Sequence, residues 1–249
     1  MTYPPPLFIV ASPHQKVGKT LIARLLIDFF GTTGRAVEGY DLHPRKPELA
    51  ERFPHLVRPI DIGDTRGQMQ LFDRLLTDDS TTKVIDLGCG FFDQFFAVMQ
   101  EISFVTEARQ RLIEPIILFV ADPETATVRT YAELRHQLKT TTFVPVHNQA
   151  VSIAFAERDF PPTWRECGVI RIQRLSPLVR RVIDWPNFSF GDYMTEHPGG
   201  ATQVHQWISP ILTRLRQLEL ELLMLRLALS LDGSSPAGVA QALAASSVE

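Results

Sequence analysis

Three consecutive residues, Gly18, Lys19 and Thr20, have the types and order needed to hold a phosphate group. They follow an apolar run at residues 7–11 and precede a helical pattern, so the sequence predicts a strand, a tight loop and a helix. Unpaired amides at a helix N-terminus attract anions, and Gly18 lets the backbone approach the phosphates. We expect Lys19 to reach the β- and γ-phosphates and the Thr20 hydroxyl to bind Mg²⁺.

The loop departs from the full pattern G-x-x-x-x-G-K-S/T, because Pro13 stands where the first glycine belongs. Proline fixes φ and has no amide hydrogen, so the loop is expected to enter by a different backbone route. The residues between, His14, Gln15, Lys16 and Val17, are further candidates for contacts with a nucleotide. A helix start with a purely structural function is the alternative.

Composition indicates a single α/β domain. The chain has 249 residues, 45% of them hydrophobic, and a net charge of -3 at pH 7, which disfavours a dedicated nucleic-acid-binding protein. Cys89 and Cys167 are too few for a disulfide framework and lack metal-site spacing. No signal peptide or membrane span is recognisable at the N-terminus, so we expect a cytoplasmic protein. Residues 1–231 are predicted to form the domain and 232–249 a mobile tail.

Two further predicted strands end in a carboxylate: residues 35–40 lead to Asp41, and residues 83–85 lead to Asp86. In open α/β sheets, ligands bind at the carboxyl ends of the strands. Asp86 is therefore a candidate to hold Mg²⁺ through its water shell, and the Gly88 amide a candidate to sense the γ-phosphate. Asp41 is a candidate to contact the metal ion or orient an attacking water, or else simply to cap a turn.

The rest of the chain alternates predicted helices and strands. Helical patterns cover residues 21–30, 68–76, 91–110, 125–138 and 179–183, and apolar strands cover 116–121, 142–146 and 168–172. This alternation predicts a doubly wound α/β fold with a mainly parallel sheet flanked by helices. Asn148, just after the strand at 142–146, is a candidate to hydrogen-bond a purine edge or else a turn residue.

The C-terminal segment carries apolar residues at alternating spacings of three and four, the pattern of packed or coiled helices. This seam consists of Ile208, Ile211, Leu215, Leu218, Leu222, Leu225 and Leu229, with a second stripe at Leu220, Leu223 and Leu227. Charged residues interrupt it too often for a bilayer span. Packing on the domain and docking to a second copy or a protein partner both stay open.

Together these landmarks resemble the ParA/MinD-like branch of P-loop ATPases, which also contains dethiobiotin synthetase and the cobyrinic acid amidases, over about residues 7–195. Residues 14–20 occupy the window of the family's deviant Walker A loop, K-G-G-x-G-K-S/T, in divergent form. Residues 41–44 are similar to switch I and residues 86–88 to switch II. Asn148 is similar to the adenine-reading asparagine, and Pro177 to the proline that packs near the base.

The resemblance implies a P-loop NTPase fold, ATP and Mg²⁺ as cofactors, an ATP-dependent homodimer and hydrolysis to ADP and phosphate. It also implies partitioning or positioning of DNA or of a cellular or conjugative machine. The family's signature lysine falls on His14, with Lys16 as a possible replacement, and the second switch I aspartate falls on His43. Asp41 is retained, but these departures predict weakened or altered hydrolysis.

Two alternatives follow. One is a nucleotide-binding scaffold that hardly hydrolyses ATP and docks a partner through its leucine seam. The other is an ATP-dependent ligase similar to dethiobiotin synthetase, whose loop also ends V-G-K-T, with Lys46 as the candidate to bind substrate. Binding of DNA would require a basic surface, for which Arg174, Arg180 and Arg181 are the nearest cluster.

Overall fold

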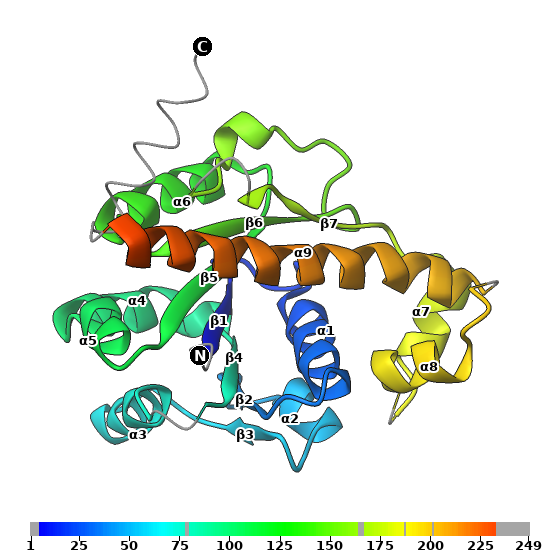
Figure 1. The fold of residues 1–249 in the computed structure, drawn as a ribbon, viewed down its shortest axis with the longest axis horizontal. Coiled ribbons are helices and arrows are strands. Elements are labelled where there is room, and N and C mark those ends of the chain that lie inside the picture. The colour runs from blue at the N-terminus through cyan, green and yellow to red at the C-terminus, as the bar shows by residue number, and fades with distance from the viewer. Residues whose placement is uncertain (1–4, 78–79, 164–166, 187, 201, 233–249) are drawn as a thin grey trace.

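A parallel sheet of seven strands runs through the part of the chain that the computed structural model describes, residues 5–77, 80–163, 167–186, 188–200 and 202–232 (Figure 1). The strands are β1 (Pro6–Ala11), β2 (Val37–Asp41), β3 (Val57–Pro59), β4 (Thr82–Asp86), β5 (Glu114–Ala121), β6 (Thr142–Asn148) and β7 (Ile170–Ile172). Their order is β3-β2-β4-β1-β5-β6-β7, and every pair is parallel. The predicted doubly wound α/β fold is confirmed.

Helices cover both faces of this sheet (Figure 1). They are α1 (Lys19–Thr32), α2 (Glu48–Arg52), α3 (Thr65–Leu75), α4 (Phe92–Glu101), α5 (Phe104–Gln110), α6 (Thr125–Gln137), α7 (Pro177–Ile183), α8 (Phe190–Glu196) and α9 (Gln203–Asp232). Short 3₁₀ turns occupy Cys89–Phe91 and Glu157–Asp159.

The central strands bury both of their faces, so alternate residues enter two separate core layers. On β1, Phe8 and Val10 pack in the layer that contains residues of α1, α8 and α9. Leu7 and Ile9 pack in the other layer, with residues of α3, α4, α5 and α6. This burial on both sides explains the uninterrupted apolar runs from which the strands were predicted.

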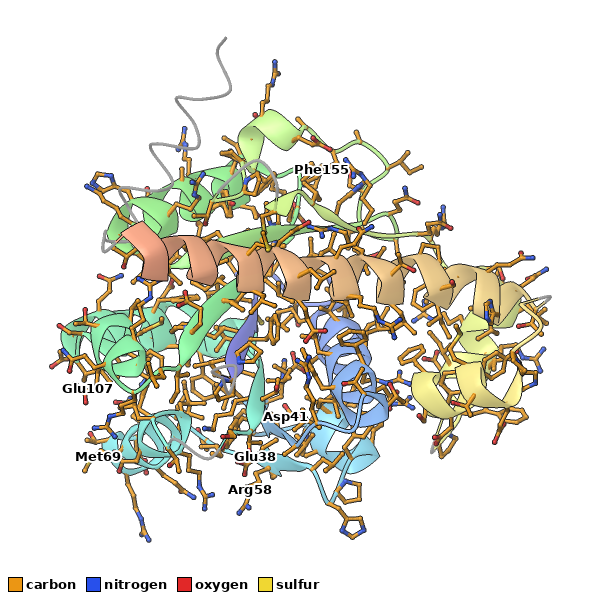
Figure 2. The ribbon with its side chains drawn as sticks, in the orientation of Figure 1. Glu38, Asp41, Arg58, Met69, Glu107 and Phe155 are labelled. Carbon is orange, nitrogen blue, oxygen red and sulfur yellow. The ribbon has the colours of Figure 1, made fainter. Side chains whose placement is uncertain are left out.

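The β3 edge of the sheet carries charged side chains. Arg58 on β3 and Glu38 on β2 form an ion pair with a distance of 2.7 Å between Nε and Oε1, and Figure 2 shows both side chains at this edge. Charges on an edge strand discourage pairing with a further strand. The sheet therefore ends at β3 in a protected form.

Several predicted boundaries change. The predicted helix over 91–110 is two helices, α4 and α5, separated by Ile102 and Ser103, the second of which has a φ of 53°. Helix α1 continues through Gly31 to Thr32 instead of stopping at the glycine. Strand β3 and helices α2 and α8 were not predicted, because three to seven residues are too few for a period to be recognised.

Helix α9 crosses one face of the sheet (Figure 1) and buries the predicted seam. Ile208, Ile211, Leu215, Leu218 and Leu222 are at most 4% exposed, whereas Leu220 of the second stripe is 60% exposed. The side chains of Leu225, Leu227 and Leu229 and the predicted tail beyond residue 232 lie outside the described residues. Among the helices described, none combines the length and the apolar character that crossing a membrane requires.

Candidate functional site

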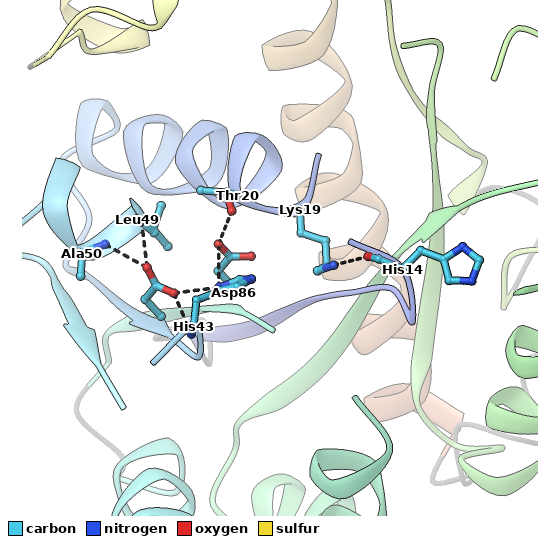
Figure 3. Close-up of polar contacts among 8 residues, drawn as sticks. His14, Lys19, Thr20, His43, Leu49, Ala50 and Asp86 are labelled. Carbon is cyan, nitrogen blue, oxygen red and sulfur yellow. Dashed lines mark hydrogen bonds and ion pairs between the residues drawn. The ribbon is translucent and has the colours of Figure 1, made fainter. Parts of the chain in front are cut away.

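The loop between β1 and α1 curls around the side chain of Lys19. Gly18 is the N-cap of α1 with a φ of 99°, and Lys19 is the first residue of the helix. The Lys19 side chain is buried, and its Nζ donates a hydrogen bond of 2.5 Å to the carbonyl oxygen of His14 (Figure 3). Burial lowers the pKa of Lys19, and the charges of Cys89 and Asp86 partly oppose this effect. The loop thus encloses a cationic group at a helix N-terminus, as phosphate binding requires.

Thr20 and Asp86 meet at the start of the same helix. The Thr20 hydroxyl donates a 2.6 Å hydrogen bond to Asp86 Oδ2 across 66 positions of sequence. Asp86 is fully buried, which raises the pKa of its carboxyl to about 6, and its Oδ1 is without a hydrogen-bond partner among the described residues. An unpaired buried carboxylate oxygen is costly unless a cation or water reaches it. A hydroxyl and a carboxylate are hard oxygen donors, so this pair fits Mg²⁺.

Asp41 lies beside Asp86, because the register of β2 and β4 pairs the two residues. Asp41 Oδ2 accepts hydrogen bonds from the amides of Leu49 at 2.9 Å and Ala50 at 3.2 Å, at the start of α2. Its Oδ1 accepts from the amide of His43 at 3.1 Å and lies 2.9 Å from that residue's Nδ1. Asp41 therefore caps a turn and a helix, and its function toward water or metal stays a prediction.

His43 bridges the two carboxylates. Its Nδ1 is 2.9 Å from Asp41 Oδ1 and 3.7 Å from Asp86 Oδ2. Burial lowers the pKa of His43, but the hydrogen bond to Asp41 and the charge of Asp86 raise it overall. Gly88 allows the segment after β4 to lie close to the segment after β2, since a Cβ at residue 88 would lie 2.4 Å from the carbonyl oxygen of Leu42. The segments predicted as switch I and switch II are therefore in direct contact.

His14 turns away from the enclosed lysine toward the loop after β5 (Figure 3). Its Nδ1 lies 3.6 Å from Asp122 Oδ2, and its Nε2 lies 3.8 Å from Glu124 Oε2. Lys16, the candidate replacement for the signature lysine, is exposed and has a φ of 60°. Sequence reasoning did not assign Asp122 or Glu124 to the site, although Asp122 directly follows strand β5 and Glu124 lies two residues further on. A carboxylate at a strand end is the signal that located Asp41.

Asn148 fastens the loop to the end of β6. Its Nδ2 donates a 2.9 Å hydrogen bond to the carbonyl oxygen of Val17, and its Oδ1 accepts one of 3.0 Å from the Ala150 amide. Val17 is buried, whereas Pro13 is half-buried and Gln15 is exposed. Recognition of a purine by Asn148 stays a prediction, and the structure gives this residue a second function in shaping the loop.

Pro177 is the first residue of α7 and is exposed. It lines a surface hollow with Arg180, Arg181, Asp184 and Trp185, of which the two arginines belong to the predicted basic cluster. Its contact with a base stays a prediction. Arg174, the third member of that cluster, is also exposed.

Lys46, the candidate residue for binding a ligase substrate, is exposed and forms an ion pair of 2.5 Å with Glu48. The ligase alternative stays a prediction.

The fold is similar to that of solved P-loop proteins. No protein-family model matches the chain, and no curated protein matches it significantly. The MinD cell division protein of Aquifex aeolicus matches with a TM-score of 0.51 and 13% identity, over 84% of this chain and 96% of that one. The chain has the fold of the ParA/MinD-like P-loop ATPases.

Two further structures match less closely. The MinC:MinD cell division protein complex of Aquifex aeolicus gives a TM-score of 0.48 and 15% identity, over 84% of this chain and 95% of that one. A nucleotide-binding protein of Archaeoglobus fulgidus in complex with ADP gives 0.39 and 19%, over 58% and 66%. At these identities the MinD-like likeness establishes the fold, and the chemistry must be argued from the residues described above.

Proposed function

We propose that the chain is a Mg·ATP-dependent switch of the ParA/MinD type. ATP binds with its phosphates in the β1–α1 loop, favours a homodimer, and is hydrolysed to ADP and phosphate, which releases the dimer. The observation that carries this proposal is the contact of Thr20 with Asp86 at 2.6 Å, beside the buried ammonium of Lys19. Lys19 and Thr20 begin the helix α1 that follows the central strand β1, and Asp86 ends the neighbouring strand β4. Together they are the parts that phosphoryl transfer requires.

Each residue then has a defined task. Lys19 leaves the carbonyl of His14 and pairs with the β- and γ-phosphates, while Thr20 and Asp86 hold Mg²⁺, directly or through its water shell. Bound Mg²⁺ neutralises charge on the transferred phosphoryl group. Asp41 orients the attacking water, and the Gly88 amide senses the γ-phosphate. Asn148 and Pro177 contact the base.

The cellular task that we propose is the partitioning or positioning of DNA or of a cellular or conjugative machine. The structurally similar Aquifex protein is described as a cell division protein, which supports a task of this kind. A partner protein would dock on the exposed side of α9, where Leu220 and Met224 are at least 60% exposed.

A second candidate is a nucleotide-binding scaffold with little turnover. It is favoured by the orientation of His14, which lies at the position of the signature lysine and faces Asp122 and Glu124. It is also favoured by Asp41, both of whose oxygens already accept hydrogen bonds from the chain itself.

Two lysines of the same loop provide a matched test, since Lys19 is buried and Lys16 is exposed. We expect Lys19→Ala to weaken binding of Mg·ATP by about 10- to 100-fold, the loss of a charge-assisted hydrogen bond, and to abolish phosphate release. Lys16→Ala should retain binding. Titration calorimetry measures the affinity, and sedimentation with a non-hydrolysable ATP analogue measures dimerisation.

The outcomes separate the candidates. Turnover and an ATP-dependent dimer in the wild-type chain support the switch, and their loss in Lys16→Ala would identify Lys16 as the replacement for the signature lysine. Tight binding without turnover or dimerisation supports the scaffold. An absence of nucleotide binding in the wild-type chain would refute both.

A further inference from the structure

Asp41, His43 and Asp86 form a compact group of three potential metal ligands. One ligand atom from each residue lies within 4.8 Å of the other two. His43 Nδ1 is 2.9 Å from Asp41 Oδ1 and 3.7 Å from Asp86 Oδ2. Donor atoms that bind one small ion at about 2.1 Å lie roughly 3.0–3.5 Å apart, so the distances of His43 Nδ1 from the two carboxylates lie within a few tenths of an ångström of those in a coordination sphere.

Asp86 is the member of this group whose carboxylate is not fully paired. Asp41 and Asp86 are both 0% exposed and occupy paired positions on neighbouring strands. Asp86 Oδ1 is buried without a hydrogen-bond partner among the described residues, so one lone-pair region of the group is unused. The side chain of His43 is 30% exposed, which leaves an approach for an ion from solvent on this side.

The imidazole decides which ions fit. Mg²⁺ selects oxygen donors and usually keeps several waters, relying on one or two carboxylates and the phosphates of a nucleotide. Imidazole nitrogen instead suits first-row transition ions. The affinity of such ligands rises from Mn²⁺ through Co²⁺ and Ni²⁺ to Cu²⁺ and is lower again for Zn²⁺. One nitrogen and two carboxylates, with Thr20 or water in the fourth position, form a donor set suited to Zn²⁺ or Co²⁺.

We propose that Asp41, His43 and Asp86 bind a first-row transition cation of the Zn²⁺ or Co²⁺ class in the absence of nucleotide. The three ligands come from the chain alone, so this site does not depend on ATP binding. It shares Asp86 with the proposed Mg²⁺ position. A transition ion and a separate Mg²⁺ ion therefore exclude one another, and the transition ion either blocks Mg·ATP or accompanies the nucleotide in place of Mg²⁺.

A second group, His14 with Asp122 and Glu124, also combines one imidazole with two carboxylates. The Glu124 side chain is 65% exposed, and no orphaned buried oxygen of the kind found at Asp86 is recorded at this group among the described residues. It is the weaker site, and it provides a matched control for the first.

The test is a titration of the metal-free, nucleotide-free full chain with Co²⁺, followed by visible absorption and by calorimetry. His43→Asn keeps a polar group near Nδ1 that can hydrogen-bond Asp41 but removes the ligand nitrogen, and His14→Asn makes the same change at the control group. We expect His43→Asn to weaken Co²⁺ binding at least about 100-fold and His14→Asn to leave it unchanged. Zn²⁺ should displace Co²⁺, and millimolar Mg²⁺ should not.

Circular dichroism and the melting temperature establish that each variant is folded, and Asp86→Asn provides a second route to removing the site. The proposal is overturned if the wild-type chain binds no Co²⁺, if Mg²⁺ displaces it readily, or if His14→Asn abolishes binding while His43→Asn does not. None of these results depends on nucleotide, so the proposed ATPase function is tested separately.

Discussion

Replacement of Gly18 by alanine is expected to damage the phosphate loop in two separate ways. Gly18 has a φ of 99°, a conformation that residues with a Cβ rarely adopt, and an added Cβ would lie 2.5 Å from Asn148 Nδ2. Asn148 cannot easily move, because it is 5% exposed and its amide is held by hydrogen bonds to Val17 and Ala150. The alanine must therefore strain its own backbone and displace a buried side chain.

The two effects can be estimated. Left-handed backbone costs an L-residue about 1–2 kcal/mol, and loss of the Asn148 hydrogen bond costs about 1 kcal/mol. The sum lowers the free energy of unfolding by about 2–3 kcal/mol. In a chain of this size each kcal/mol lowers the melting temperature by about 2–4 °C, so Gly18→Ala should melt roughly 4–12 °C below the wild type.

Gly34→Ala is the control, because Gly34 has a φ of 72° and no neighbouring atom within 4 Å of an added Cβ. It should show the backbone cost alone, about 1–2 kcal/mol. Thermal unfolding by calorimetry compares the two variants, and the additional loss in Gly18→Ala should disappear when Asn148 is also alanine. If Gly18→Ala melts no lower than Gly34→Ala, the reasoning about Asn148 is refuted.

Two further predictions concern stability. Burial raises the pKa of Asp28 to about 6, although hydrogen bonds from Phe190 and Ser189 oppose the shift, so folding favours the protonated acid. The stability from Asp28 is therefore present below its ordinary pKa of 3.8 and is lost as pH rises through about 6, a change of about 3 kcal/mol. The free energy of unfolding of Asp28→Asn, measured in urea, should vary less with pH over this interval than that of the wild type. The same pH profile in both proteins would contradict the prediction. Leu218 is 1% exposed, so Leu218→Ala should lower the free energy of unfolding by about 2–5 kcal/mol. Leu220 is 60% exposed, so Leu220→Ala should change it by no more than about 0.5 kcal/mol. Equal denaturant midpoints for the two variants would show that α9 does not pack as described.

The main architecture was predictable because its signals are local. A strand buried on both faces reads as an apolar run, and a glycine, lysine and threonine after such a run mark the phosphate loop and the start of α1. Helix α2 could not be read in this way. It has five residues, and its first amides are capped by Asp41, a residue of the preceding strand.

The site was predictable in its parts and less so in its contacts. Gly18, Lys19, Thr20 and Asp86 lie together as the spacing of strand tips implied. The direction of His14 was not readable, because it depends on a loop backbone that includes a positive φ at Lys16. Such a conformation is uncommon for a residue other than glycine and leaves no signature in the sequence.

The register of β2 and β4 connects the proposed Mg·ATP site with the proposed transition-metal site. Because β2 and β4 are parallel and in step, Asp41 and Asp86 are neighbours, and the fold places two buried carboxylates together. Like charges at such a distance in a medium of low polarity oppose one another, which contributes to the raised pKa of Asp86. Hydrogen bonds from backbone amides satisfy Asp41. Asp86 Oδ2 accepts a hydrogen bond from the Thr20 hydroxyl, and its Oδ1 has no partner among the described residues. A divalent cation relieves this deficit whether it arrives with ATP or alone, and His43 at the open side determines which cation is preferred.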